Sequence, residues 1–147
     1  MMSGIKIIAA GIAGTFVMTL FSKILSRTAK ENFDEPEILS KLYCRLDNRY
    51  LPSDRDRMVG YSLHYGVGVL FNLVYVKLLN THKRDTSLAE ELFIGVASGI
   101  IGVSIWQVTL ILHPDPPRLS WKDFYKQLIV AHIFLSVTAC ELNKKLA

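Results

Sequence analysis

Four long stretches that are poor in charged side chains constrain the fold of this 147-residue chain more than any other feature. They cover residues 5–25, 59–79, 92–112 and 123–142. Each has about 20 residues, the length at which an α-helix crosses the ~30 Å hydrocarbon core of a bilayer. Because backbone groups in lipid must be hydrogen-bonded internally, the stretches predict helices. We therefore expect an all-α membrane protein with four transmembrane helices in a bundle, forming one integral membrane domain over residues 1–147.

The first stretch has an alternative interpretation as a secretory signal peptide, because a short basic segment precedes its apolar centre. The residues behind Phe21 read Ser-Lys-Ile-Leu-Ser-Arg-Thr-Ala, and no small-x-small cleavage motif directly follows the apolar core. We therefore expect this stretch to be an uncleaved anchor.

The charge balance indicates lipid rather than nucleic acid as the partner. The net charge is +4, but no nucleic-acid-binding motif accompanies it. Basic residues commonly flank membrane helices, where they contact anionic headgroups. The two cysteines, Cys44 and Cys140, have no CxxC partner, so neither a disulfide framework nor a zinc knuckle is indicated.

The loop after the first stretch is expected to contain a short amphipathic helix. Asp34 precedes Glu37 by three residues, as in a capping box, and Pro36 is tolerated in a first helical turn. Apolar residues then recur on one helical face, at Ile38, Leu39, Leu42, Tyr43 and Leu46. Such a helix can lie on the membrane surface or against the bundle, and the sequence leaves both arrangements open.

Short matches between the two halves suggest a 2+2 internal repeat. Ala10–Gly14 is similar to Ser98–Gly102, and Pro36–Tyr43 is similar to Pro117–Tyr125. The second and fourth stretches also each place a histidine in their early half. A duplicated two-helix unit, related by an axis along the membrane normal, would produce these matches.

The distribution of basic residues predicts an orientation. The first and third loops lie on one side of the membrane and hold 11 of the 17 Lys and Arg residues. The positive-inside rule then places these loops in the cytoplasm and both termini outside.

Each stretch carries small or polar residues at helical spacings of three and four, which we expect to face the bundle interior. Glycine and alanine also allow close helix packing, so the pairs Gly95/Gly99 and Ala10/Gly14 predict helix contacts within the chain or in a homo-oligomer. The polar and small residues of the four stretches are Gly11, Thr15, Thr19 and Ser22; His64, Gly68, Asn72 and Tyr75; Gly95, Gly99, Gly102 and Trp106; and His132, Ser136 and Cys140.

Three histidines are expected in the same half of the bundle, and they define the candidate site. His64 and His132 lie within stretches, and His113 ends the third stretch; His82 lies in the opposite short loop. An ionisable side chain inside a membrane is costly and therefore marks a functional site by default. The full candidate polar cluster consists of His64, His113, His132, Asn72, Gln107 and Asp115.

Several roles for the histidines remain open. The simplest is hydrogen bonding between helices. A proton or ion path would run through them, and His113 beside Asp115 would suit a pH sensor. His64 and His132 would be the ligands of a haem or metal ion if one is bound. No catalytic motif accompanies them, so the sequence does not indicate an enzyme or a cofactor.

From the His64 stretch to its end, the chain resembles the YagU-like family of small four-span bacterial inner-membrane proteins. The shared features are the histidine near the start of the second helix, Pro116-Pro117 after the third helix, and His132 in the fourth. The resemblance implies a multi-pass protein of a bacterial inner membrane with a link to acid resistance. It also implies cytoplasmic termini, which conflicts with the orientation that the charges predict.

These observations lead to a functional hypothesis. We expect a small conduit or sensor in proton, ion or acid-stress homeostasis. The alternatives are a haem- or metal-binding redox subunit and an assembly partner of a larger membrane complex.

Overall fold

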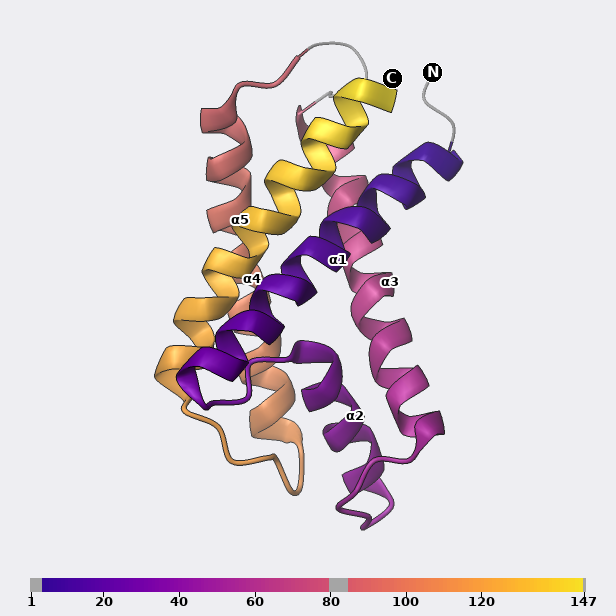
Figure 1. Cartoon of the computed structure of the whole chain (residues 1–147), viewed down its shortest axis with the longest axis vertical. Coiled ribbons are helices and arrows are strands. Elements are labelled where there is room, and N and C mark those ends of the chain that lie inside the picture. Colours follow the sequence, from indigo (N-terminus) through magenta and orange to yellow (C-terminus); the bar gives the residue numbers. More distant parts are fainter. Residues whose placement is uncertain (1–3, 80–84, 147) are drawn as a thin grey trace.

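The structure is a computed structural model that describes residues 4–79 and 85–146. The regular structure of this part of the chain is entirely helical (Figure 1). Its elements are α1 (Gly4–Ala29), α2 (Glu35–Leu46), α3 (Asp54–Leu79), α4 (Leu88–Leu112) and α5 (Trp121–Leu146).

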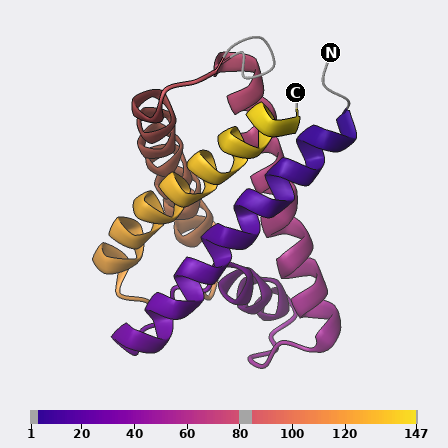
Figure 2. The ribbon, with the colours of Figure 1, turned by 45° about the horizontal axis from the view of Figure 1, so that its top comes forward.

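The two helices at the centre of the molecule are α1 and α5, which run antiparallel and pack along each other (Figures 1 and 2). α3 packs on α1 and α4 packs on α5, whereas α3 and α4 barely touch. α1 begins and α5 ends at the same end of the molecule, where Lys6 Nζ donates to the carbonyl oxygen of Leu146 over 2.7 Å. α2 lies at the opposite end.

Three of the described helices, α1, α3 and α4, are long and apolar enough to cross a membrane. Large apolar side chains are exposed on them, among them Phe16, Leu70 and Ile105. Exposed apolar surface on this scale indicates contact with lipid, since soluble monomers rarely show it. The three helices therefore identify a membrane protein.

The prediction of a four-span bundle is wrong, because α5 lacks the hydropathy of a span. Along its length α5 buries Gln127, His132, Ser136 and Asn143, all with hydrogen-bonding side chains. Gln127, Ser136 and Asn143 find partners in neighbouring helices, whereas His132 bonds to the carbonyl oxygen of Leu128 within α5. A central helix can be polar where a lipid-facing helix cannot.

The predicted 2+2 repeat is also wrong as a description of the packing. A repeat of two-helix units would give α3 and α4 the same contact as α1 and α5. Instead α1 and α5 pack extensively, while α3 and α4 diverge. The counterpart of α2 in the second half is also missing, because residues 113–120 form no helix.

α2 forms where the sequence predicted a short amphipathic helix, and it packs against α3. A Cβ atom on Gly60 of α3 would lie only 2.5 Å from the carbonyl oxygen of Pro36, so the glycine permits this close approach. Asp34 is the N-cap residue, but its side chain makes no cap hydrogen bond. It forms an ion pair with Lys23 over 3.7 Å instead.

The small-residue faces of α1 and α4 are used within the chain. A Cβ atom on Gly14 would lie 2.8 Å from the carbonyl oxygen of Leu135. A Cβ atom on Gly99 would lie 2.7 Å from Cα of Ile129. These glycines therefore allow α1 and α4 to pack closely against α5, and the homo-oligomer stays a prediction.

Candidate functional site

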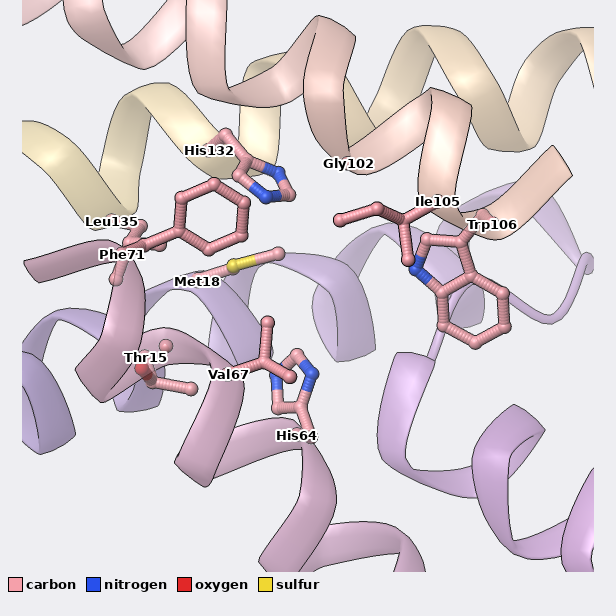
Figure 3. Close-up of a pocket in the computed structure, with 11 residues that line it drawn as sticks. Thr15, Met18, His64, Val67, Phe71, Gly102, Ile105, Trp106, His132 and Leu135 are labelled. Carbon is pink, nitrogen blue, oxygen red and sulfur yellow. The ribbon is translucent and has the colours of Figure 1, made fainter. Parts of the chain in front are cut away.

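A cavity of about 50 Å³ opens between α3 and α4, where these two helices diverge (Figure 3). Side chains from α1 and α5 close it on the inner side. His64 and His132 both line this α3–α4 cavity, and most of the remaining wall is apolar, including Met18, Val67, Phe71, Ile105 and Trp106. The structure thus brings together two of the three histidines that the sequence singled out.

Of the two ring nitrogens of His132, Nδ1 forms a hydrogen bond within the described residues and Nε2 does not. The side chain is 4 % exposed, and Nδ1 lies 2.8 Å from the carbonyl oxygen of Leu128. Because a carbonyl oxygen only accepts, this bond assigns the proton to Nδ1 and leaves a lone pair on Nε2. Within residues 4–79 and 85–146, no group donates to Nε2. The ring packs against Gly102, where a Cβ atom would lie 2.8 Å from Nε2.

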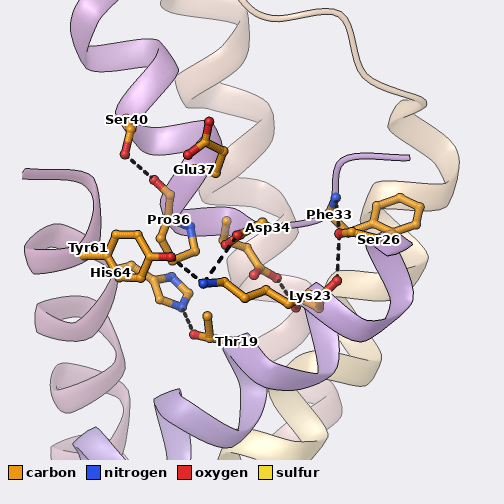
Figure 4. Close-up of polar contacts among 12 residues, drawn as sticks. Thr19, Lys23, Ser26, Phe33, Asp34, Pro36, Glu37, Ser40, Tyr61 and His64 are labelled. Atoms are coloured by element: carbon orange, nitrogen blue, oxygen red, sulfur yellow. Dashed lines mark hydrogen bonds and ion pairs between the residues drawn. The ribbon is translucent and has the colours of Figure 1, made fainter. Parts of the chain in front are cut away.

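His64 is held in the opposite tautomer. Its Nε2 lies 3.0 Å from Oγ1 of Thr19 (Figure 4). The Thr19 hydroxyl donates its hydrogen to the carbonyl oxygen of Thr15 over 2.8 Å, so its oxygen is available as an acceptor. His64 therefore donates from Nε2 and retains a lone pair on Nδ1. Both imidazoles of the cavity are neutral acceptors.

A second group of polar side chains lies where α1, α2 and α5 meet, and we call it the Glu35 cluster: Glu35, Ser22 and Gln127. Glu35 is 0 % exposed. Ser22 Oγ lies 2.9 Å and Gln127 Nε2 lies 3.1 Å from Oε1 of Glu35. Gln127 Nε2 also donates to Ser22 Oγ over 2.6 Å. Among the described residues, none forms a hydrogen bond with Oε2 of Glu35.

The pKa of Glu35 depends on its burial and on its lack of a cationic partner among the described residues. No Lys or Arg among the described residues pairs with it, because the nearby Lys23 is engaged by Asp34 and Tyr61 (Figure 4). Burial removes water from the carboxylate, and the neutral donors around it compensate only in part. Burial therefore raises the pKa of Glu35 from 4.5 to about 7. This carboxyl group titrates in the physiological range.

A second fully buried carboxyl, Glu91 in α4, has the opposite environment. Lys144 Nζ lies 2.9 Å from its Oε1, and the Thr86 hydroxyl donates to the same oxygen over 2.6 Å. Glu91 is thus half of an ion pair that ties α4 to the end of α5. Glu35 and Glu91 are thus both fully buried, but only Glu91 has a cation beside it among the described residues.

His113, Asp115 and Gln107 lie outside the α3–α4 cavity. His113 Nε2 lies 2.9 Å from the carbonyl oxygen of Leu42, and its Nδ1 accepts from the Asp115 amide over 3.1 Å. Asp115 is exposed and pairs with Arg45 over 3.6 Å, and Gln107 is exposed on α4. His113 thus ties the end of α4 to α2, and the predicted cluster of three histidines does not form.

Asn72 belongs to a separate contact near the other end of the bundle. Its side chain is fully buried, and it donates to the carbonyl oxygen of Ile7 over 2.8 Å and accepts from Asn143 over 2.7 Å. This arrangement joins α1, α3 and α5. His82 lies outside the described residues.

The residues of the cavity do not fit a haem. A porphyrin is far larger than a cavity of about 50 Å³. Nor does the described part of the chain hold a group of three or more His, Cys, Asp or Glu side chains placed for a metal ion.

The sequence did not predict the Glu35 cluster as a site. Only Ser22 of its three residues was expected to face the bundle interior. Glu35 lies in the segment Asp-Glu-Pro-Glu, whose charges are typical of a solvated first helical turn. Gln127 offered the usable signal, because a glutamine within an apolar helix needs a partner.

No family model, curated protein or solved structure matches this chain. The resemblance to the YagU-like family therefore stays a prediction.

Proposed function

We propose that this chain is a pH-responsive membrane protein, in which protonation of Glu35 controls how α2 docks on the helix bundle. The observation that carries the proposal is a fully buried carboxyl with neutral hydrogen-bond partners and no cation in the part of the chain that the structure describes. A pKa of about 7 means that small changes around neutral pH alter its charge. A location in a bacterial inner membrane and a role in acid stress, both implied by the resemblance, are consistent with such a sensor.

The position of Glu35 explains how its protonation could affect the docking of α2. It is the first residue of α2, yet its carboxyl reaches Ser22 of α1 and Gln127 of α5. The rest of α2 packs on α3, with few contacts to α1. Protonated Glu35 therefore holds the start of α2 to the central helix pair. When Glu35 is deprotonated, no cation offsets its buried charge. Hydration of the carboxylate then favours a looser contact between the start of α2 and the central helix pair.

A sensor is favoured over a conduit by the packing between the two ends of the bundle. Leu128, Ala131 and Leu135 of α5 are at most 1 % exposed, and they separate the Glu35 cluster from the Asn72–Asn143 contact. No continuous chain of hydrogen bonds within the described residues crosses this apolar layer. A proton bound at Glu35 thus stays at one end of the molecule.

The proposal is tested by infrared titration of the carboxyl C=O band in the detergent-solubilised protein. We expect a carboxyl that loses its proton at a pH of about 7, and this band should be absent in Glu35→Gln. Glu31→Gln is the matched control, because it removes the same charge from an exposed position four residues earlier. If every carboxyl band of the native protein titrates below pH ~5, the proposal fails.

A further inference from the structure

The α3–α4 cavity contains two hydrogen-bond acceptors to which no group of residues 4–79 and 85–146 donates. His132 is 4 % and His64 is 8 % exposed, and each has given its ring proton to another group. Nε2 of His132 and Nδ1 of His64 therefore keep their lone pairs. Any occupant that satisfies these nitrogens must bring a hydrogen-bond donor.

The walls of the cavity restrict the occupant further. Apart from the histidines, Thr15 and the indole N–H of Trp106, they consist of glycine and apolar groups (Figure 3). A charged donor such as an ammonium ion would lose its hydration there without gaining an anionic partner. A neutral hydroxyl avoids this cost.

The route into the cavity indicates where the occupant comes from. Val67 and Ile105, on the two helices that frame the opening, are 45 % and 51 % exposed. Both lie on α3 and α4, two of the helices apolar enough to cross a membrane. A molecule that enters between them comes from the hydrocarbon region of the bilayer.

The volume of the cavity limits how much of a bound molecule it can enclose. A cavity of about 50 Å³ holds a few groups of the size of a water molecule. It accommodates a hydroxyl and the first carbons of a chain, while a longer chain extends outward between α3 and α4.

We propose that the α3–α4 cavity binds the hydroxyl end of a neutral, lipid-soluble alcohol, which donates to Nε2 of His132 and keeps its alkyl chain among the exposed apolar side chains of α3 and α4. The site is separate from the Glu35 cluster, and the inference does not rest on the pH-sensor proposal.

The experiment uses the full chain in detergent with ¹⁵N-labelled histidine and follows the His132 Nε2 resonance by NMR. The probe is n-decanol, and methyl nonyl ether is the matched compound of the same length without a donor. We expect a saturable shift of the Nε2 resonance with decanol and none with the ether, since an ether cannot donate to the lone pair. Equal or non-saturable shifts with both compounds would mean that they only partition into the micelle, and no shift with either would mean that the cavity holds water only. Both results overturn the proposal.

A pair of glycine variants provides the second arm. In Gly102→Ala, the new methyl group would lie 2.7 Å from Cε1 and 2.8 Å from Nε2 of His132, so the ring must move. Gly66→Ala places the same methyl group in open space on α3. We expect decanol to bind about tenfold more weakly to Gly102→Ala and unchanged to Gly66→Ala. Equal affinity in the two variants would contradict the assignment to His132. If Gly102→Ala does not fold, the comparison of decanol with the ether in the native protein still decides.

Discussion

Gln127 Nε2 lies 3.1 Å from Oε1 of Glu35, although 92 positions separate the two residues in sequence. This hydrogen bond joins the second turn of α5 to the first residue of α2. It places a neutral amide, rather than a cation, beside the buried carboxyl. Because the partner is neutral, it only partly offsets the burial of the carboxylate, and we therefore expect Glu35 to affect stability near neutral pH.

Folding stability is expected to fall as the pH rises through neutrality. Glu35 has a higher pKa in the folded protein than the ordinary value of 4.5, so its stabilising contribution is complete below pH 4.5 and is lost as the pH approaches about 7. The loss amounts to about 3 kcal/mol at 1.36 kcal/mol per pH unit. Thermal unfolding in detergent at pH 5 and pH 8 measures it. Glu35→Gln should remove this contribution and Glu31→Gln should keep it; the same pH dependence in both would contradict the prediction.

Removal of the Gln127 amide is expected to raise the pKa of Glu35 further, because its hydrogen bond stabilises the charged carboxylate. Gln127→Leu should therefore shift the infrared titration of Glu35 to higher pH. Gln107→Leu is the matched control, since Gln107 is exposed on α4. Identical titrations of the two variants would show that Gln127 does not act on the carboxyl.

Cys44 is expected to report the docking of α2. Its side chain is 0 % exposed, and Sγ lies 3.2 Å from the carbonyl oxygen of Arg49. If deprotonation of Glu35 loosens α2, a thiol reagent at pH 8 should modify Cys44 several-fold faster in the native protein than in Glu35→Gln. Cys140→Ser removes the second thiol from both proteins. Because the two rates are compared at one pH, the ionisation of the thiol itself cancels, and equal rates would argue against movement of α2.

Lys144 is expected to be essential for stability because it neutralises Glu91. Lys144→Met would leave a carboxylate that is 0 % exposed without its cation, which typically costs about 3–5 kcal/mol. Combining it with Glu91→Gln should restore most of the loss, since position 91 then carries no buried charge. Lys145→Met, at an exposed neighbouring position, should change the melting temperature little. A loss in Lys145→Met as large as in Lys144→Met would contradict this role.

Local sequence patterns were sufficient to place most of the helices. The apolar stretches 5–25, 59–79 and 92–112 lie within α1, α3 and α4, and the spacing of Ile38 and Leu42 marked the buried face of α2. These features depend on periodicity and hydropathy, which act over a few helical turns. The same patterns could not separate α5 from a membrane span, because hydropathy does not tell buried apolar residues such as Leu128 and Leu135 from exposed ones such as Val130.

The residues of the site were predicted less well than the helices, because local patterns do not show which helices are neighbours. His64 and His132 line one cavity, but His113 contacts α2 and Asn72 contacts Asn143. Depth along a helix can be counted from sequence, whereas the direction in which a side chain points across the bundle depends on which helices are neighbours.

The sequence by itself determined that this protein is helical and membrane-associated, because long apolar runs admit few other solutions in lipid. The tertiary structure alone decided that Glu35 lies buried beside Gln127 and that Glu91 lies beside Lys144. In sequence both are ordinary glutamates at the start of a helix. Whether a cation or a neutral amide lies beside each carboxyl depends on which distant helices pack together.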